Sequence, residues 1–203
     1  KGIFMKNKAI QGDLNGLLSN FLIKQRQNTV KPYLDKKKNI LDLGCGVFSW
    51  GNLLQPATSY TGVDIEPDII SFNKEHYPEY FFYQKNLDQE ELSLPLGNFD
   101  LVIMLAILEH LENPAKVLRE VKETLQDDGI IILSTPHPRG ESVLEIGSKV
   151  KIFSQDKHQH QPLFDRKKIQ DIAEQADLKI VEFRSFLFGF NQKVVLSKKQ
   201  ENI

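Results

Sequence analysis

One stretch, residues 39–64, constrains the fold of this chain more than any other. It reads NILDLGCGVFSWGNLLQPATSYTGVD: an apolar run, a glycine-rich turn, a short stretch expected to be helical, and a second apolar run that ends in an acid. Gly44 and Gly46 allow a sharp turn and let the backbone approach a ligand with no Cβ in the way. Asp64 follows that turn by about 20 residues, where a carboxylate can accept two hydrogen bonds from a ribose diol. The stretch is typical of the nucleotide-binding half of a doubly wound sheet.

Length and charge bound the class of protein. The chain has 203 residues, of which 40% are hydrophobic and 26% charged, so it can bury a normal core. We expect a single domain over residues 1–203, with a helical N-terminal appendage at 1–35. The formal net charge of -1 argues against a dedicated nucleic-acid binder. The oligomeric state is not readable from the sequence.

Several classes of protein are disfavoured by what the sequence lacks. Cys45 is its one cysteine, which excludes an internal disulfide and a cysteine-rich metal site. No apolar run reaches the roughly 20 residues of a membrane span, and no secretory leader is visible. The expectation is therefore a cytoplasmic protein.

Strand and helix signals alternate along the chain. Apolar residues at helical spacing from Leu14 to Leu22 predict an amphipathic helix that Asp13 can cap. Further strands are expected at 59–63, 80–83, 99–105, 130–134, 178–186 and 193–197. Helices are expected from Pro67 to about His76, from Asn113 to Leu125, where residues 127–129 end the helix with a turn, and from Asp165 to Ala176. The last two strands predict an antiparallel hairpin joined through Gly189.

Residues 136–162 interrupt this alternation and are expected to form an irregular substrate-side insertion, with a short helix at 142–153. An insertion this long is usually functional or mobile, and it should border the ligand crevice. His137, His158 and His160 are therefore candidates for a general base, foremost His137 and His160, although loop histidines in water remain an alternative. His158 and His160 lack a convincing third metal ligand, so no metal is expected.

The motifs ILDLGCG, GVDIEP, FDLVIMLAILEHLENPAKVLREV and DDGIIILSTP together resemble the class I S-adenosylmethionine-dependent methyltransferases, closest to the branch with ubiquinone-biosynthesis-type and related small-molecule enzymes. The resemblance covers residues 39–136. It implies an α/β fold: a Rossmann-like, doubly wound, seven-stranded sheet, mostly parallel, with a C-terminal antiparallel hairpin. It also implies S-adenosylmethionine as cofactor and S-adenosylhomocysteine as product.

The resemblance assigns cofactor roles to strand-end residues. It places Asp42, Gly44, Cys45 and Gly46 along the amino-acid end, Asp64 on the ribose and Ile65 on one adenine face. It places Asn86, Leu87 and Asp88 at the adenine edge, where either Asn86 or Asp88 supplies the acid, and it places Leu105, Ala106 and His110 under the methionine part. Phe48 departs from the family, which often carries a third glycine there.

The expected activity is in-line methyl transfer to an oxygen or nitrogen of a small-molecule, lipid-linked or sugar acceptor. One alternative is a catalytically inactive module that still binds the cofactor, motivated by Phe48 and by the lack of a clear base. Another is a nicotinamide oxidoreductase, although its glycine motif would require glycine at Ser49. Trp50, Phe186, Phe188 and Phe190 are interpreted as core or edge packing rather than as an acceptor platform.

Overall fold

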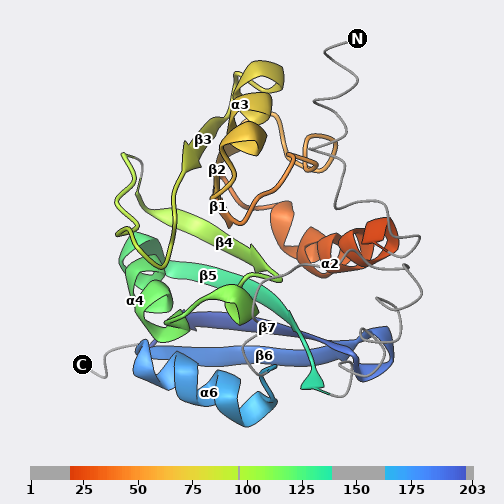
Figure 1. Cartoon of the computed structure of the whole chain (residues 1–203), viewed down its shortest axis with the longest axis vertical. Helices are drawn as coiled ribbons and strands as arrows, with labels where there is room; N and C mark the ends of the chain where they lie inside the picture. Colours follow the sequence, from red (N-terminus) through yellow and green to blue (C-terminus); the bar gives the residue numbers. More distant parts are fainter. Residues whose placement is uncertain (1–18, 96, 139–162, 200–203) are drawn as a thin grey trace.

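Seven strands form one sheet in the order β3–β2–β1–β4–β5–β7–β6 in the computed structural model, which describes residues 19–95, 97–138 and 163–199 (Figure 1). In chain order the described elements are α2 (Ser19–Leu34), β1 (Asn39–Leu43), β2 (Ser59–Asp64), α3 (Pro67–His76), β3 (Phe81–Gln84), β4 (Phe99–Leu105), the 3-10 turn η2 (Leu108–His110), α4 (Pro114–Thr124), β5 (Leu125–Pro136), α6 (Arg166–Gln175), β6 (Leu178–Phe186), the 3-10 turn η4 (Leu187–Gly189) and β7 (Asn191–Lys198).

The pairing confirms the predicted doubly wound sheet with its C-terminal hairpin. Strands β3, β2, β1, β4 and β5 run parallel to one another. Strand β7 lies antiparallel between β5 and β6, so β6 forms the outer edge. Because the parallel strands share one direction, the carboxyl ends of β1, β2 and β4 all lie at the same edge of the sheet. The glycine turn, Asp64 and Ala106 lie at that edge.

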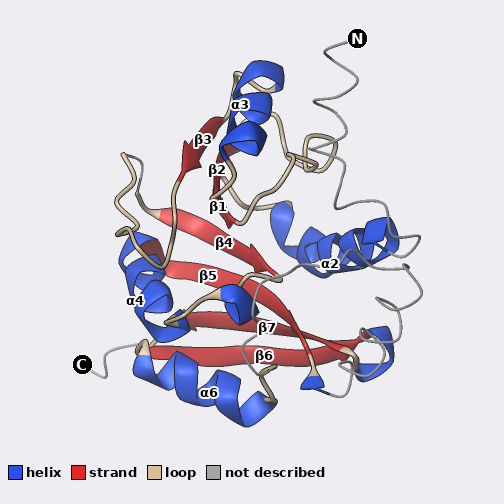
Figure 2. Ribbon diagram, viewed as in Figure 1, coloured by secondary structure: helices blue, strands red, loops and turns tan. Residues whose placement is uncertain are grey.

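Helices pack on both faces of the sheet (Figure 2). A buried apolar layer lies on each face. On β1, Leu41 and Leu43 face the layer built with α4 and α6, whereas Ile40 faces the layer built with α2 and α3. Successive strand residues point to opposite faces, so Asp42 lies on the same face as Ile40. This alternation decides which helix each strand-end side chain meets.

The predicted helical stretch after the glycine turn is wrong. Residues 47–58 contain turns and no helix before β2 begins at Ser59. Phe48 and Trp50, two positions apart, are both 3% exposed and belong to one apolar layer. A helix would turn residues two apart to different faces, so burying both aromatic rings on one side favours an irregular path.

The turn predicted at residues 127–129 is also wrong. Helix α4 ends at Thr124, and β5 runs from Leu125 to Pro136 with a register shift opposite Phe99 and Leu101. A Cβ on Gly129 would lie 2.9 Å from the Phe99 carbonyl oxygen, so glycine serves close packing within this irregular strand. Sequence alone reads such a glycine as a turn residue.

The remaining predictions agree to within a residue or two, except at the N-terminus. The helix there continues to Leu34, well beyond Leu22. The third strand is shifted by one residue, to Phe81–Gln84. Helix α3 has the predicted bounds, and Asn113 and Asp165 cap α4 and α6 as predicted. Asp13, Leu14, the helix predicted at 142–153 and His160 lie outside the described residues.

Candidate functional site

The glycine turn after β1 presents bare backbone at the carboxyl edge of the sheet. Gly44 and Gly46 have φ of 71° and 54°, a region that disfavours side chains. The amides of Gly44 and Cys45 both donate to the Val63 carbonyl, over 2.8 and 3.0 Å. A Cβ on Gly44 would meet Ile107 Cδ1 at 2.0 Å, whereas one on Gly46 would have no neighbour within 4 Å. Gly46 therefore faces open space.

Asp64 at the end of β2 is joined directly to this turn. Its Oδ2 accepts a 2.8 Å hydrogen bond from the Gly46 amide, and its Oδ1 accepts one of 3.1 Å from the Glu66 amide. An ionised carboxylate offers about four acceptor positions, so two remain for a diol. The neighbouring Ile65 is 52% exposed, which leaves an apolar surface beside the acid.

Asp42 lies beneath the turn and is almost fully buried. Its Oδ2 accepts hydrogen bonds from Trp50 Nε1 (2.8 Å) and the Tyr60 hydroxyl (2.7 Å). Burial raises the pKa of Asp42 to about 6; the bonds from Tyr60 and Trp50 oppose this shift, and the charge of Asp64 adds to it. Asp42 thus ties the irregular stretch after the turn to β1 and β2.

The rings of Phe48 and Trp50 point into the core, not toward the open side of Gly46. The Phe48 ring centroid lies 4.8, 4.7 and 4.9 Å from those of Tyr60, Tyr77 and Tyr80. Phe48 therefore leaves the space above Gly46 clear although it replaces a glycine. Packing is confirmed for Trp50 and is wrong for Phe188, which is 98% exposed at the tip of the β6–β7 hairpin.

The thiol of Cys45 is directed inward. A Cβ on Gly62 would come within 2.9 Å of Cys45 Sγ, so the sulfur packs against β2. Burial raises the pKa of the thiol, and the charges of Asp42 and Asp64 add to this shift. A thiol held in its neutral form is not a nucleophile at neutral pH. Cys45 contributes its backbone to the turn.

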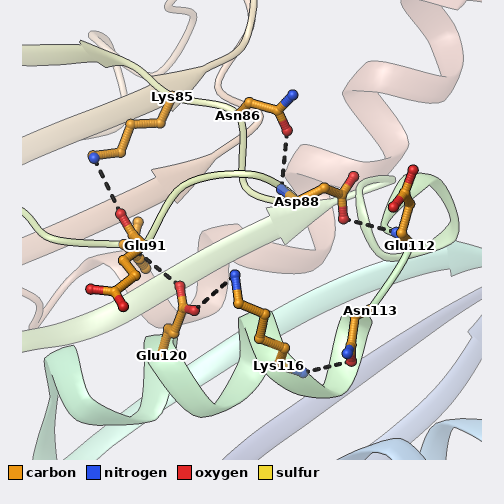
Figure 3. A network of polar contacts seen from close by, with 9 residues as sticks. Lys85, Asn86, Asp88, Glu91, Glu112, Asn113, Lys116 and Glu120 are labelled. Carbon is orange, nitrogen blue, oxygen red and sulfur yellow. Dashed lines mark hydrogen bonds and ion pairs between the residues drawn. The ribbon is translucent and has the colours of Figure 1, made fainter.

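The loop after β3 is held by its own polar side chains (Figure 3). Asn86 Oδ1 accepts from the Asp88 amide over 3.0 Å, and Asp88 Oδ1 accepts from the Glu112 amide over 2.8 Å. The second bond links the β3–β4 loop to the segment between η2 and α4. Leu87, between the two polar residues, packs on the apolar layer of α4. All three expected residues are thus brought to one loop beside Ile65, whose carbonyl accepts from Gln84 at the end of β3.

The chain leaves β4 through a left-handed residue. Ala106 has φ of 56°, and its amide donates to the Ser134 carbonyl over 2.8 Å. This backbone conformation is costly for a residue with a Cβ and directs the chain back over the turn, where Ile107 meets Gly44. Glu109 and His110, which follow, differ in exposure: Glu109 is 4% exposed, whereas His110 lies at the surface.

Arg26 on α2 was missed by the motif analysis. Its Nε is buried and has no hydrogen-bond acceptor among the described residues. Desolvation lowers the pKa of Arg26, while the charge of Glu109 raises it. The neighbouring Gln27 donates to Ser49 Oγ over 2.5 Å, which places this part of α2 beside the segment after the glycine turn. A buried donor without an acceptor is costly, so Nε of Arg26 marks a position where an anionic group would be stabilised. Its signal in the sequence is a charge four residues before the buried Val30.

Asn73 on α3 is a second residue that the motif analysis missed. It is fully buried and bonds to the glycine turn and the residues beside it. Nδ2 donates to the Gly46 carbonyl over 2.8 Å and, more weakly, to Cys45 Sγ over 3.9 Å, and Oδ1 accepts from the Phe48 amide over 2.9 Å. Its signal is an amide three residues after the buried Ile70, on the core-facing side of the helix.

The predicted bases are only partly placed. His137 follows β5, is half-buried, and its amide donates to the Phe190 carbonyl over 2.9 Å. His160 lies outside the described residues. Among the described residues, no group of three or more His, Cys, Asp or Glu side chains is arranged to hold a metal ion. No helix in that same part of the chain is long and apolar enough to cross a membrane.

Comparison with known proteins decides the family. A family model described as a methyltransferase domain matches residues 15–183, most of the chain. The chain belongs to this family. The methyltransferase is 25% identical over 168 residues to a ubiquinone biosynthesis O-methyltransferase of Haemophilus ducreyi, covering 75% of this chain and 70% of the relative. It is 30% identical over 101 residues to a probable S-adenosylmethionine-dependent methyltransferase of Mycobacterium tuberculosis, covering 49% of this chain and 36% of the relative.

Solved structures agree with this assignment. The fold of the methyltransferase matches that of magnesium protoporphyrin IX methyltransferase from Synechocystis, solved with S-adenosylhomocysteine bound, at a TM-score of 0.67 and 20% identity over 98% of this chain and 95% of the other. This methyltransferase is accordingly an S-adenosylmethionine-dependent enzyme. The residues present fit the cofactor: open backbone at Gly46, a carboxylate with acceptor positions left, and an exposed apolar side chain beside it.

Proposed function

We propose that this methyltransferase moves the methyl group in line to an oxygen of a small-molecule or lipid-linked acceptor. The choice of oxygen is supported by relatives named ubiquinone biosynthesis O-methyltransferase, which are 22–28% identical to this chain over alignments of 124–168 residues. A nitrogen acceptor and a sugar acceptor are the competing outcomes of the experiment described below.

One observation carries the cofactor part of the proposal. The Gly46 amide is bonded to Asp64, and the space next to Gly46 is open. The two remaining acceptor positions of Asp64 suit the two ribose hydroxyls, and Ile65 would pack on one face of adenine. The adenine edge then falls to Asn86, Leu87 and Asp88. Of the two polar residues, Asp88 suits the adenine amino group better. Its Oδ1 accepts from the Glu112 amide, but a carboxylate has a second acceptor oxygen, whereas the single acceptor oxygen of Asn86 already accepts from the Asp88 amide.

The amino-acid end of the cofactor is proposed to lie between Gly44–Gly46, Ala106 and α2. Arg26 would pair with its carboxylate, since the buried Nε of Arg26 has no hydrogen-bond acceptor among the described residues. Asp42 Oδ2 is already taken by Trp50 and Tyr60, so a contact with the cofactor's amine falls to Oδ1. Leu105 and Ala106 would support the methionine chain from the end of β4, with His110 beside them.

The cofactor supplies an electrophilic methyl group on a sulfonium. The chain's own residues then have three tasks: to align the acceptor with that methyl group, to exclude water, and to remove the proton of a hydroxyl acceptor. We assign the last task to His137 or His160, because imidazole titrates near neutrality and both belong to the segment that follows β5. The bond between sulfur and the methyl carbon breaks as the bond between that carbon and the acceptor oxygen forms. The hydroxyl proton passes to the histidine, so the reaction balances.

Two measurements test the proposal. Calorimetry should show that the purified protein binds S-adenosylmethionine and S-adenosylhomocysteine, and absence of binding to both contradicts the cofactor site. Transfer of a labelled methyl group should then be followed to phenols and catechols with and without an alkyl tail, to amines and to sugars. Turnover on the phenols and catechols alone is the expected result. Turnover on amines or sugars alone would contradict the proposed class of acceptor. Cofactor binding without turnover on any member of the panel would favour the inactive module.

A further inference from the structure

The glycine turn of this chain lacks the support that a following helix would give. Residues 47–58 contain no helix, so backbone groups at the start of this stretch have no helical partners. Buried backbone amides and carbonyls need hydrogen bonds from somewhere. Two of them, the Gly46 carbonyl and the Phe48 amide, find both bonds on one side chain.

That side chain is Asn73 on α3, which is fully buried. Its Nδ2 donates to the Gly46 carbonyl over 2.8 Å, and its Oδ1 accepts from the Phe48 amide over 2.9 Å. An amide is the side chain that offers a donor and an acceptor side by side, and the two backbone partners fix which end is which. Neither bond survives replacement by an aliphatic side chain of similar size.

The two ends of the Gly46 residue are therefore held by one β2–α3 unit. Asp64, at the end of β2, takes the Gly46 amide, and Asn73 takes the Gly46 carbonyl. Helix α3 begins at Pro67, three residues after Asp64, so both contacts move together. This arrangement sets the position of the bare backbone relative to the acid proposed to hold the ribose.

We propose that Asn73 is a positioning residue that holds the glycine turn in its cofactor-binding conformation and thereby sets cofactor affinity. The inference rests on the proposed cofactor site. Asn73 contacts the turn from the core side, so it acts through Gly46 and Phe48 rather than on the ligand. The packing of Phe48 and Trp50 imposes an irregular stretch where a helix could otherwise support the turn. Tight cofactor binding remains possible because Asn73 holds the turn in place of that helix.

Two variants test the role. Asn73→Leu removes both bonds and keeps most of the volume. Asn73→Asp keeps the acceptor for the Phe48 amide but, when ionised, turns an oxygen toward the Gly46 carbonyl. A protonated carboxyl group restores the donor, and burial raises the pKa of such a group. We expect both variants to bind S-adenosylhomocysteine at least tenfold more weakly than wild type at pH 8, and Asn73→Asp alone to recover toward wild type as the pH is lowered to about 5.5.

Asp165→Ala is the matched control, because it removes the cap of α6 and lowers stability without touching the turn. Its affinity for S-adenosylhomocysteine should equal that of wild type. Wild-type affinity in Asn73→Leu, or a pH-independent ratio to wild type in Asn73→Asp, would overturn the proposal. Loss of folding in both variants would also overturn it, since Asn73 would then serve stability. If the wild-type protein itself failed to bind, the cofactor site would be contradicted instead.

Discussion

The amide of Gly46 donates a 2.8 Å hydrogen bond to Oδ2 of Asp64, across two neighbouring strands and 18 positions of sequence. This bond brings the bare backbone of the turn and the strand-end acid into one unit. Two of the four acceptor positions of the carboxylate are then used by the protein, and two remain for a ligand.

Replacing Asp64 by alanine should weaken S-adenosylhomocysteine binding by at least about tenfold, because each hydrogen bond to a charged group contributes about 1.5–3 kcal/mol. Calorimetry at fixed ionic strength measures the change. Asp68→Ala is the control, an exposed acid at the start of α3 whose loss should leave affinity as it is. Equal affinities for Asp64→Ala and wild type would show that the ribose is held elsewhere.

Arg26→Ala should discriminate between two ligands that differ only at the amino-acid end. S-adenosylhomocysteine carries a carboxylate, and 5′-methylthioadenosine does not. The variant should bind the first at least about tenfold more weakly than wild type does, and the second equally well, because a charge-assisted pair is lost only with the first. Lys24→Ala, an exposed cation on the same helix, is the control. An equal loss for both ligands would exclude a contact with the carboxylate.

Gly44→Ala and Gly46→Ala should fail in different ways. Both place a Cβ at positive φ, at a cost of about 1–2 kcal/mol. At Gly44 the new atom also meets Ile107 Cδ1 at 2.0 Å, so Gly44→Ala should lower the thermal midpoint more. At Gly46 it meets no protein atom and points into the proposed ligand space, so affinity should fall further than stability.

The double variant Gly44→Ala with Ile107→Ala separates clash from strain. It should regain part of the midpoint that Gly44→Ala loses, because the overlapping side chain is gone and only the backbone strain remains. A midpoint no higher than that of Gly44→Ala alone would mean that the Ile107 contact does not limit the turn.

The buried Asp42 should make stability depend on pH. Its pKa rises from 3.8 to about 6 on folding, mainly through desolvation, so between these values the folded protein holds a proton that the unfolded chain has released. The free energy of unfolding should therefore fall as the pH rises through this window, by up to about 1.4 kcal/mol per unit. The Asp42→Asn variant should lack this slope, because its amide oxygen still accepts from Trp50 and Tyr60 but does not titrate.

Urea denaturation between about pH 4 and pH 8 measures this difference. Asp127→Asn is the control, since Asp127 is fully exposed and its replacement should leave the wild-type slope. Parallel curves for Asp42→Asn and wild type would mean that Asp42 does not carry the effect.

Local sequence signals predicted correctly those features that depend on local chemistry, such as turns, helix starts and caps. The glycine turn, the acid ending β2, the proline that opens α3 and the caps Asn113 and Asp165 all stand where the pattern put them. The two clear errors, at residues 47–58 and 127–129, share a cause: packing against other strands overrode the local preference. Burial of Phe48 and Trp50 prevented a helix, and Gly129 served a strand irregularity rather than a turn.

The sequence by itself determined the class of fold, the family and the strand-end positions of the site, because these follow from periodicity and from motifs read along the chain. The tertiary structure decided which side chains serve that site from a distance. Asn73 donates to Gly46, Trp50 and Tyr60 both donate to Asp42, and the charge of Glu109 acts on Arg26. Such contacts depend on strand order and on which face each residue takes. Local sequence does not encode either, because both are fixed only when the whole sheet assembles.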